Sequence, residues 1–511
     1  MARSMNGCLA HLHKAKNHNL LGLIFIVMFA IIGAVFLLPG HAAPPSCTTT
    51  LNVGANVGSA LQSAASGSVV CLNSGTWAAQ TLSGMTPSSM VTLQPAPGQS
   101  VTMGGFTTTG QVNNLTVQGI TFTNTFFMRA GISNLILQYN TFENFSAYAV
   151  HGNPQSINVG PTINGVQVLH NQMDFVSDCV RGDGDENNWT ISNNVCGPGI
   201  GQGGNVDDHY IQFGGVDGIT IDNNAFEGPF NAGSLAASAH NNVIHLWGGQ
   251  SNVDIENNII WHTQSRAQTI LIEEGQTNKV TIKNNLDVED PSNFTNSNIY
   301  TMAWDINHVD GNNVAGQGSV IENNTADHPF WGSFNGVLFQ SGDSASDNQQ
   351  TVENNIVTPS APGGNSNFNV SCTAGCTYAN NVSGDGSAPG SGSTKNWTPN
   401  WQTTTWTPNN GEPWSPPPTG YYVPVGLTGV GYQGSIGPGN SGTVGVSAFS
   451  SSGGSTPLTG DLNNDGHVNI FDLSIFLSHW QQAGSSLPED FNHDNTVNIF
   501  DLSILLSHYG S

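Results

Sequence analysis

Two short segments near the end of the chain carry oxygen-bearing side chains at the spacing of a twelve-residue calcium loop. Residues 468–475 are repeated unchanged as 497–504, so this region is an internal duplication. Each copy offers side-chain oxygens at positions 1, 3, 5, 9 and 12 and a backbone carbonyl at position 7. The ligands are Asp461, Asn463, Asp465, His467, Asn469 and Asp472 in the first loop, and Asp490, Asn492, Asp494, Thr496, Asn498 and Asp501 in the second. Because Ca²⁺ takes six to eight hard oxygen ligands, the sequence predicts two calcium ions.

The charge around these loops also favours calcium. From Asp461 to Tyr509 there are seven acidic residues and no Lys or Arg, so repulsion without metal predicts metal-dependent folding. The pair resembles a type I dockerin, a small α-helical module that attaches secreted glycan-degrading enzymes to cohesin domains on scaffolds or cell surfaces. The resemblance implies a cohesin partner. Positions 10 and 11 depart from it, being Ile-Phe in both copies where cellulosomal dockerins often carry small hydroxyl residues.

A second set of reactive residues recurs through the middle of the chain. Short apolar–polar alternations such as Ile211–Phe213, Ile244–Leu246 and Ile270–Ile272 indicate strands, in which the residues between the apolar ones face solvent. The predicted outward row contains His151, Arg181, Gln212, His245, Glu273, Asp305 and Gln340, and nearby turns add Asp183, Asp207, Asp208, His209, Glu274 and His308. Such a row predicts a sugar-binding groove, with a merely solvated face as the alternative.

The spacing of these groups limits the chemistry. Equivalent residues of adjacent strands lie about 5 Å apart, and skipping one strand gives nearly 10 Å. Glu273 with Asp305 would suit a retaining glycosidase, and Asp207 or Asp208 with Glu273 an inverting one. Arg181 is the one basic residue in the row, as a lyase would need to neutralise a uronate carboxylate. We interpret the chain as a glycoside hydrolase, with a polysaccharide lyase or a non-catalytic surface glycan binder as alternatives.

One sequence motif recurs along these strands: an apolar residue, any residue, an apolar residue, two more positions and then asparagine. The asparagines are Asn140, Asn171, Asn194, Asn224, Asn258, Asn285, Asn324, Asn355 and Asn381, spaced by 23 to 39 residues. A repeat of this length predicts a solenoid of stacked coils, with an inward ladder of asparagine amides at a turn. Tandem asparagines such as Asn193-Asn194 suit a left-handed bend. The pattern resembles the right-handed parallel β-helix proteins, the pectate lyase-like group rich in polysaccharide-active enzymes.

Composition divides the chain into six segments. These are a signal peptide or membrane anchor (1–42), an N-terminal cap with the first coils (43–110), the β-helix repeats (111–382), a C-terminal cap (383–446), a Ser/Gly linker (447–457) and the dockerin-like module (458–511). The tryptophans after 396 invite a carbohydrate-binding interpretation, and covering the last coil is the preferred alternative. The sequence has only 9 Lys and Arg residues against 34 Asp and Glu residues, for a net charge of −25, which argues against a nucleic-acid partner.

The N-terminus predicts export. A basic segment precedes nineteen uncharged residues, Leu20–Leu38, and cleavage after Ala42 would release a secreted protein, whereas retention would anchor it at the cell surface. Six cysteines follow, which are Cys47, Cys71, Cys179, Cys196, Cys372 and Cys376. An even number in an exported chain predicts disulfides, with nearest-neighbour pairing preferred among fifteen connectivities. A zinc site is the weaker alternative.

Overall fold

The computed structural model contains two compact units, Pro44–Gly454 and a second unit made of Ser455–Ser511 with Met1–Ala43. The structure describes residues 45–129, 131–153, 163–184, 186–200, 209–228, 241–261, 269–273, 277–288, 304–307, 318–327, 339–341, 349–358, 368, 375–384, 388–398, 400–401, 423–433 and 444–451 of the first unit, and residues 473, 476–477, 480, 491 and 496–507 of the second. The predicted signal or anchor segment therefore lies outside the described residues. Among those that are described, no helix is long and apolar enough to cross a membrane.

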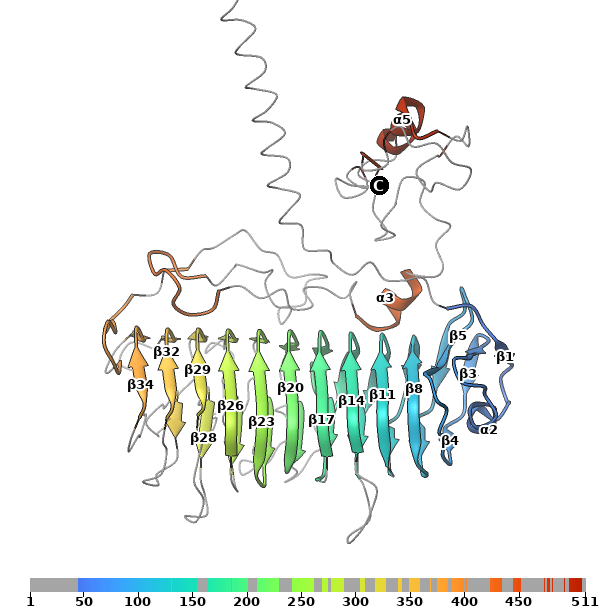
Figure 1. Cartoon of the computed structure of the whole chain (residues 1–511), viewed down its shortest axis with the longest axis horizontal. Coiled ribbons are helices and arrows are strands. Elements are labelled where there is room, and N and C mark those ends of the chain that lie inside the picture. The colour runs from blue at the N-terminus through green and yellow to red at the C-terminus, as the bar shows by residue number, and fades with distance from the viewer. Residues whose placement is uncertain are drawn as a thin grey trace, which may run out of the picture. The chain divides into compact units, whose positions relative to one another are not determined.

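The first unit is a parallel β-helix of three sheets, as the sequence predicts (Figure 1). Sheet A contains β1 (Thr49–Leu51), β2 (Val69–Leu72), β5 (Val91–Pro95), β8 (Val112–Gln118), β11 (Ile132–Gln138), β14 (Ile163–Leu169), β17 (Glu186–Ser192), β20 (Val216–Asp222), β23 (Gln250–Glu256), β26 (Thr277–Lys283), β29 (Val320–Glu322), β32 (Thr351–Glu353) and β34 (Thr377–Ala379). Sheet B contains β3 (Gly75–Trp77), β6 (Val101–Met103), β9 (Ile120–Phe122), β12 (Thr141–Phe145), β15 (Gln172–Val176), β18 (Val195–Cys196), β21 (Ala225–Glu227), β24 (Ile259–Trp261), β27 (Leu286–Val288), β30 (Thr325–Asp327), β33 (Ile356–Val357) and β35 (Val382–Ser383). Sheet C contains β4 (Gln80–Leu82), β7 (Phe106–Thr108), β10 (Phe126–Met128), β13 (Val150–Gly152), β16 (Val180–Gly182), β19 (Ile211–Gly214), β22 (Ile244–Trp247), β25 (Ile270–Glu273), β28 (Trp304–Asn307) and β31 (Phe339–Ser341). The chain passes from A to B to C and back to A in each coil, and inward apolar side chains of the three sheets form one continuous core.

The predicted asparagine ladder lies at the corner between sheets A and B. All nine asparagines are buried. The Oδ1 atom of each accepts a hydrogen bond from the preceding coil, and its Nδ2 atom donates to a neighbouring coil. Asn258 illustrates the pattern. Its Oδ1 accepts from the backbone and side-chain nitrogens of Asn224, both at 3.0 Å, and its Nδ2 donates to the Ile221 carbonyl at 2.8 Å. The ladder therefore satisfies polar groups that the turn removes from water.

The residue before each ladder asparagine makes the bend. Tyr139, His170, Asn193, Asn223, Asn257, Asn284, Asn323, Asn354 and Asn380 all have φ between +52° and +59°. Most are asparagine because its short polar side chain tolerates the left-handed region that β-branched residues avoid. The tandem asparagines therefore have separate tasks, with the first turning the chain and the second linking the coils.

Helices and a returning segment cover parts of this unit. At the N-terminal end, α2 (Val57–Gln62) is capped by Asn56 and buries Val57 and Leu61. The C-terminal segment, 423–433 with α3 (Gly445–Ser451), packs along the outer face of sheet B. Val430 packs against β33 and β35, Tyr432 against β24 and β27, and Val444 against β18 and β21.

Two tryptophans bear on the capping prediction. Trp397 and Trp401 pack against the cluster of Ile356, Val382 and Val430, with their rings 5.2 Å apart. Their contact with the last coils agrees with the preferred covering role. Trp406 and Trp414 lie outside the described residues.

The structure confirms two nearest-neighbour disulfides, Cys47–Cys71 and Cys179–Cys196. Cys376 is also disulfide-bonded, whereas Cys372, its predicted partner, lies outside the described residues. With these cysteines paired, the zinc alternative loses the thiolates it would require.

The second unit is described in part. Helix α5 (Ile499–Ser507) follows the second predicted calcium loop, and Leu505 packs with Phe476 and Val497. Phe476 stacks on Phe491 with ring centroids 6.2 Å apart. The two halves of the duplicated sequence thus share one small apolar core.

Replacing a ladder asparagine should destabilise the β-helix much more than replacing its neighbour. In Asn258→Ala, two buried nitrogens of Asn224 lose their acceptor, at a cost on the order of 3 kcal/mol. Asn257→Gly is the matched control. It keeps the left-handed turn and loses half-buried hydrogen bonds, for a cost of about 1 kcal/mol. Urea denaturation followed by circular dichroism measures both, and equal effects would contradict a structural role for the ladder.

Candidate functional site

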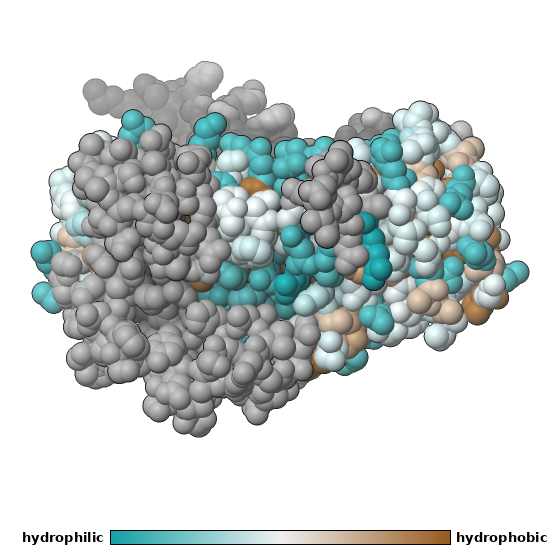
Figure 2. All heavy atoms as spheres, turned by 90° about the horizontal axis from the view of Figure 1, so that it is seen from below, coloured by the Kyte–Doolittle hydropathy of each residue, from teal (hydrophilic) through white to brown (hydrophobic). Residues whose placement is uncertain are grey.

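Strand register places most of the predicted outward residues in one row on sheet C. His151 pairs with Arg181, Arg181 with Gln212, and Gln212 with His245. The row continues through Leu271 to Asp305 and Gln340, and on the other side through Phe127 to Thr107 and Thr81. The face seen from below Figure 1 is largely hydrophilic over its described atoms (Figure 2). Strand register therefore aligns these positions in one row, within which Arg181 and His245 are partly exposed and His151 and Gln212 are largely buried.

Glu273 does not belong to this row, and its predicted pairing with Asp305 is wrong. The residue opposite Asp305 is Leu271, whereas Glu273 pairs with Trp247 and Asn307. Leu271 and Glu273 are two positions apart in β25, so period-two alternation alone selects neither. In backbone register Glu273 and Asp305 are therefore offset by two residues, roughly 6.6 Å along the strand. Asp207, Asp208, Glu274 and His308 lie outside the described residues.

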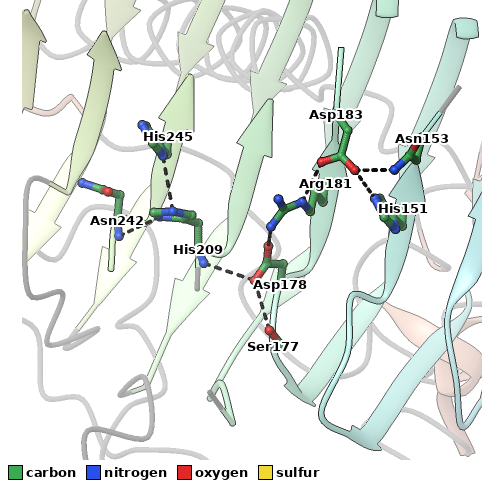
Figure 3. Close-up of polar contacts among 9 residues, drawn as sticks. All are labelled: His151, Asn153, Ser177, Asp178, Arg181, Asp183, His209, Asn242 and His245. Atoms are coloured by element: carbon green, nitrogen blue, oxygen red, sulfur yellow. Dashed lines mark hydrogen bonds and ion pairs between the residues drawn. The ribbon is translucent and has the colours of Figure 1, made fainter. Parts of the chain in front are cut away.

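His151, Asp183 and Arg181 form a hydrogen-bonded group (Figure 3). The Oδ2 atom of Asp183 lies 2.8 Å from His151 Nε2 and 2.7 Å from Asn153 Nδ2, and its Oδ1 accepts from Arg181 Nε at 2.8 Å. Partial burial alone would raise the pKa of Asp183, but hydrogen bonds from His151 and Arg181, with their charges, outweigh it and lower the pKa to about 2. Asp183 is therefore a carboxylate at neutral pH.

This arrangement sets the tautomer of His151. A carboxylate accepts hydrogen bonds, so Nε2 carries the hydrogen, and Nδ1 of the neutral ring is left as a base. The ring stacks on Phe127 at 4.7 Å and meets the edge of Tyr148 at the same distance. Only 11% of the side chain is exposed, so its orientation is fixed from several sides.

Arg181 is held by a second carboxylate. Its Nη1 lies 3.6 Å from Oδ2 of Asp178, which is fully buried, and the guanidinium also stacks over Tyr148 at 4.7 Å. Burial would lower the pKa of Arg181, but the hydrogen bond that it donates to Asp183 and the charge of Asp178 raise it. The cation is permanent and fixed, although the two carboxylates offset part of its field.

His209 is buried and its ring contacts His245, which argues against its predicted substrate-binding role. It is 1% exposed, and its Nδ1 accepts the backbone N–H of Asn242 at 3.1 Å. Its proton must then lie on Nε2, which donates to His245 Nδ1 at 3.3 Å. His245 consequently carries its own proton on Nε2. In this network His245 can donate a hydrogen bond through Nε2.

The residues that the sequence analysis missed lie mainly in turns. Asp178, Tyr148, Asn153 and Asn242 precede or follow the short strands of sheet C by one or two residues, where alternation assigns no direction. Their position at the ends of the row strands was the available signal. Among the residues described, no three His, Cys, Asp or Glu side chains converge as metal ligands do.

Of the twelve predicted calcium ligands, the structure describes Thr496, Asn498 and Asp501. Asp501 is buried in the first turn of α5, and its Oδ2 accepts the backbone N–H of Asn498 at 2.9 Å. Asn498 Nδ2 donates to the Thr496 carbonyl at 2.8 Å. The position-12 carboxylate therefore points back toward its loop. The other nine predicted ligands lie outside the described residues.

Comparisons with known proteins give remote structural likenesses. No family model and no curated protein matches the chain. Solved structures that match include a PL6 alginate lyase complexed with a trisaccharide, at 14% identity over 80% of this chain and 96% of that one, TM-score 0.41. A mutant of the PL6 alginate lyase AlyGC matches at 15% identity over 78% of this chain and 58% of that one, TM-score 0.43. A PL6 polysaccharide lyase from Pseudopedobacter saltans matches at 10% identity over 64% and 92%, TM-score 0.34.

These likenesses are too distant to carry the assignment of fold or function. This chain spans little more than half the length of the AlyGC mutant. The fold therefore rests on the strand pairing described above, and the chemistry rests on the contacts of the sheet C row.

Asp183 gives the site a measurable dependence on pH. Because its folded pKa is lowered, its stabilising contribution is complete above about pH 4, the usual value for an unfolded Asp, and is lost as the pH falls toward about 2. Allowing for solvent screening, Asp183→Asn should lower the free energy of unfolding by about 1–2 kcal/mol at neutral pH.

Urea denaturation across this pH range tests the expectation. The difference between Asp183→Asn and wild type should shrink as the solution is acidified, and the exposed Asp254→Asn controls for the loss of one carboxylate. A difference that stays constant with pH would show that the ion pairs of Asp183 do not stabilise the fold.

Proposed function

We propose that the β-helix unit is a polysaccharide lyase that cleaves a uronate-containing polysaccharide by β-elimination in the groove of sheet C. The observation that carries this proposal is the adjacent pair His151 and Arg181, joined through Asp183. It supplies a base and a fixed cation one strand spacing apart, about 4.8 Å. Lyase is also the activity named for the matching solved structures, although the proposal rests on the site.

The two residues divide the reaction between them. Arg181 binds the uronate carboxylate and offsets its charge, which makes the proton on C5 more acidic. His151 Nδ1 removes that proton while Asp183 stabilises the imidazolium through Nε2. The C–H electron pair forms the C4–C5 double bond, the C4–O bond breaks, and the departing oxygen takes a proton from water. The products are a new reducing end and an unsaturated uronate.

The same groups fit the hydrolase interpretation poorly. A glycosidase needs a carboxylic acid whose pKa is raised so that it can protonate the leaving oxygen. The pKa of Asp183 is instead lowered to about 2, and Asp178 is fully buried against Arg181. Glu273 and Asp305 are offset by two residues. Among the described residues the site therefore favours elimination.

Gln212 and His245 extend the groove beyond the reacting ring. They lie one and two strand spacings from Arg181, so they would contact the neighbouring sugar. Gln212 is 9% exposed, and within the described part of the chain its Oε1 has no hydrogen-bond partner. His245 offers a neutral N–H. An amide and a neutral donor suit sugar hydroxyls.

A panel of soluble polysaccharides tests the activity. The wild-type protein should release products with the ultraviolet absorbance of an unsaturated uronate, and His151→Ala and Arg181→Ala should each lower kcat/KM at least about a hundredfold. Lys283→Ala, which removes an exposed cation of sheet A, is the matched control and should leave the rate unchanged. Reducing ends without that absorbance would instead establish a hydrolase, and binding without products a glycan-binding protein.

For the second unit we propose two calcium ions and attachment to a scaffold or cell-surface protein. The oxygen donors of both loops suit Ca²⁺, and Asp501, at position 12, lies in the first turn of α5 with Oδ2 turned toward Asn498 of the loop. Ile499, at position 10, is 58% exposed and so is accessible to a cohesin-type partner. The disulfides support an exported protein, in keeping with the N-terminal segment.

Calorimetric titration of the calcium-depleted chain should give two ions per molecule. Asp501→Asn should remove one of them, because Asn keeps an oxygen that can accept from Asn498 N–H but lacks the charge that binds the metal. Asp217→Asn, on the exposed face of the β-helix, is the control and should leave the stoichiometry at two. Retention of both ions by Asp501→Asn would rule out the second loop.

A further inference from the structure

Trp247 is an aromatic residue of sheet C that the proposed reaction does not use. It follows His245 by two residues in β22, so it lies on the same outward side of the strand. Its side chain is half-buried, and its register partners are Gly214 in β19 and Glu273 in β25. A large apolar ring on a hydrophilic face therefore lies beside the groove.

Gly214 leaves the space that this ring occupies. A Cβ atom at Gly214 would lie 2.7 Å from Cζ2, 2.9 Å from Cε2 and 3.2 Å from Cη2 of Trp247. The indole thus extends across the neighbouring coil and lies against its backbone. The backbone of Gly214 does not adopt the left-handed region, so the turn geometry does not require glycine here. The glycine is required by the ring.

We infer that Trp247, seated on Gly214, is the stacking platform for a sugar ring of the substrate. This inference rests on the proposed polysaccharide groove. The C–H face of a pyranose is apolar and packs on an aromatic face, while its hydroxyls point outward to polar groups. Gln212 and His245, in the adjacent row, provide those groups.

The position identifies which ring is bound. Strand β22 lies two spacings from β16, but the indole reaches back over Gly214 of β19, one strand spacing from the coil of Arg181 and two residues farther along the strand. The stacked ring is therefore a neighbour of the uronate that reacts. Stacking does not depend on charge, which matters in a chain of net charge −25 that repels polyanions. The platform supplies binding free energy that electrostatic attraction does not.

Affinity electrophoresis with the polysaccharide panel tests this platform on the whole protein. Trp247→Ala should weaken binding about tenfold, equivalent to about 1.4 kcal/mol, and Trp247→Phe should retain most of the affinity. Gly214→Ala should weaken it as well, because the new Cβ displaces the indole. Trp480→Ala, which removes a tryptophan 37% exposed in the second unit, is the matched control and should not change the binding.

Kinetics separates a platform from a residue that merely supports the fold. Trp247→Ala should raise KM with kcat nearly unchanged and with an unchanged melting temperature. If Trp247→Ala binds and turns over substrate like the wild type, the platform is wrong while the lyase assignment stands. If Trp247 is needed for binding but no unsaturated product forms, the platform stands and the lyase assignment fails. A wild-type protein retarded by none of the polysaccharides would overturn the platform.

Discussion

The buried amide at the corner between sheets A and B is the interaction on which the rest of the β-helix depends. Each ladder asparagine accepts from the coil before it and donates toward the coil after it, so it fixes the position of the turn in every coil. Because a strand shifted by one residue would reverse its inward and outward faces, the ladder also fixes the strand faces. Residues distant in sequence are thereby aligned on the outer face of sheet C.

That alignment explains how a sequence with few charges can gather a cluster of hydrogen-bonded polar and charged side chains. His151 and Arg181 are register neighbours, one strand spacing apart, although their coils differ in length. They align because the ladder fixes the corner between sheets A and B in every coil. The turns then supply the groups that hold them, with Asp178 and Asp183 fixing the guanidinium. The strand pairing sets the spacing along the row, and residues of the turns hold the side chains of His151 and Arg181 through hydrogen bonds and ion pairs.

Much of this architecture could be predicted because it repeats. The repeated asparagine motif marks the corner between sheets A and B, together with the left-handed residue before it. Period-two alternation, counted back from that corner, then places the row from His151 to Gln340. The alternation could not choose between Leu271 and Glu273, which face the same way. Nor could it show that His209 is buried, that Asp178 reaches Arg181, or that Gly214 makes room for Trp247. These depend on turn conformation and on contacts between coils, which no single strand encodes.

The link between sheets A and B is two residues long in every coil from β11 to β34, whereas the coils differ in length by up to sixteen residues. All the extra residues therefore enter on either side of sheet C, where β18 and β19 are separated by the stretch from Cys196 to Ile211. Insertions or exchanges there leave the amide ladder untouched. The length of these connections can thus vary while the corner between sheets A and B is retained, which makes this scaffold suited to loop replacement.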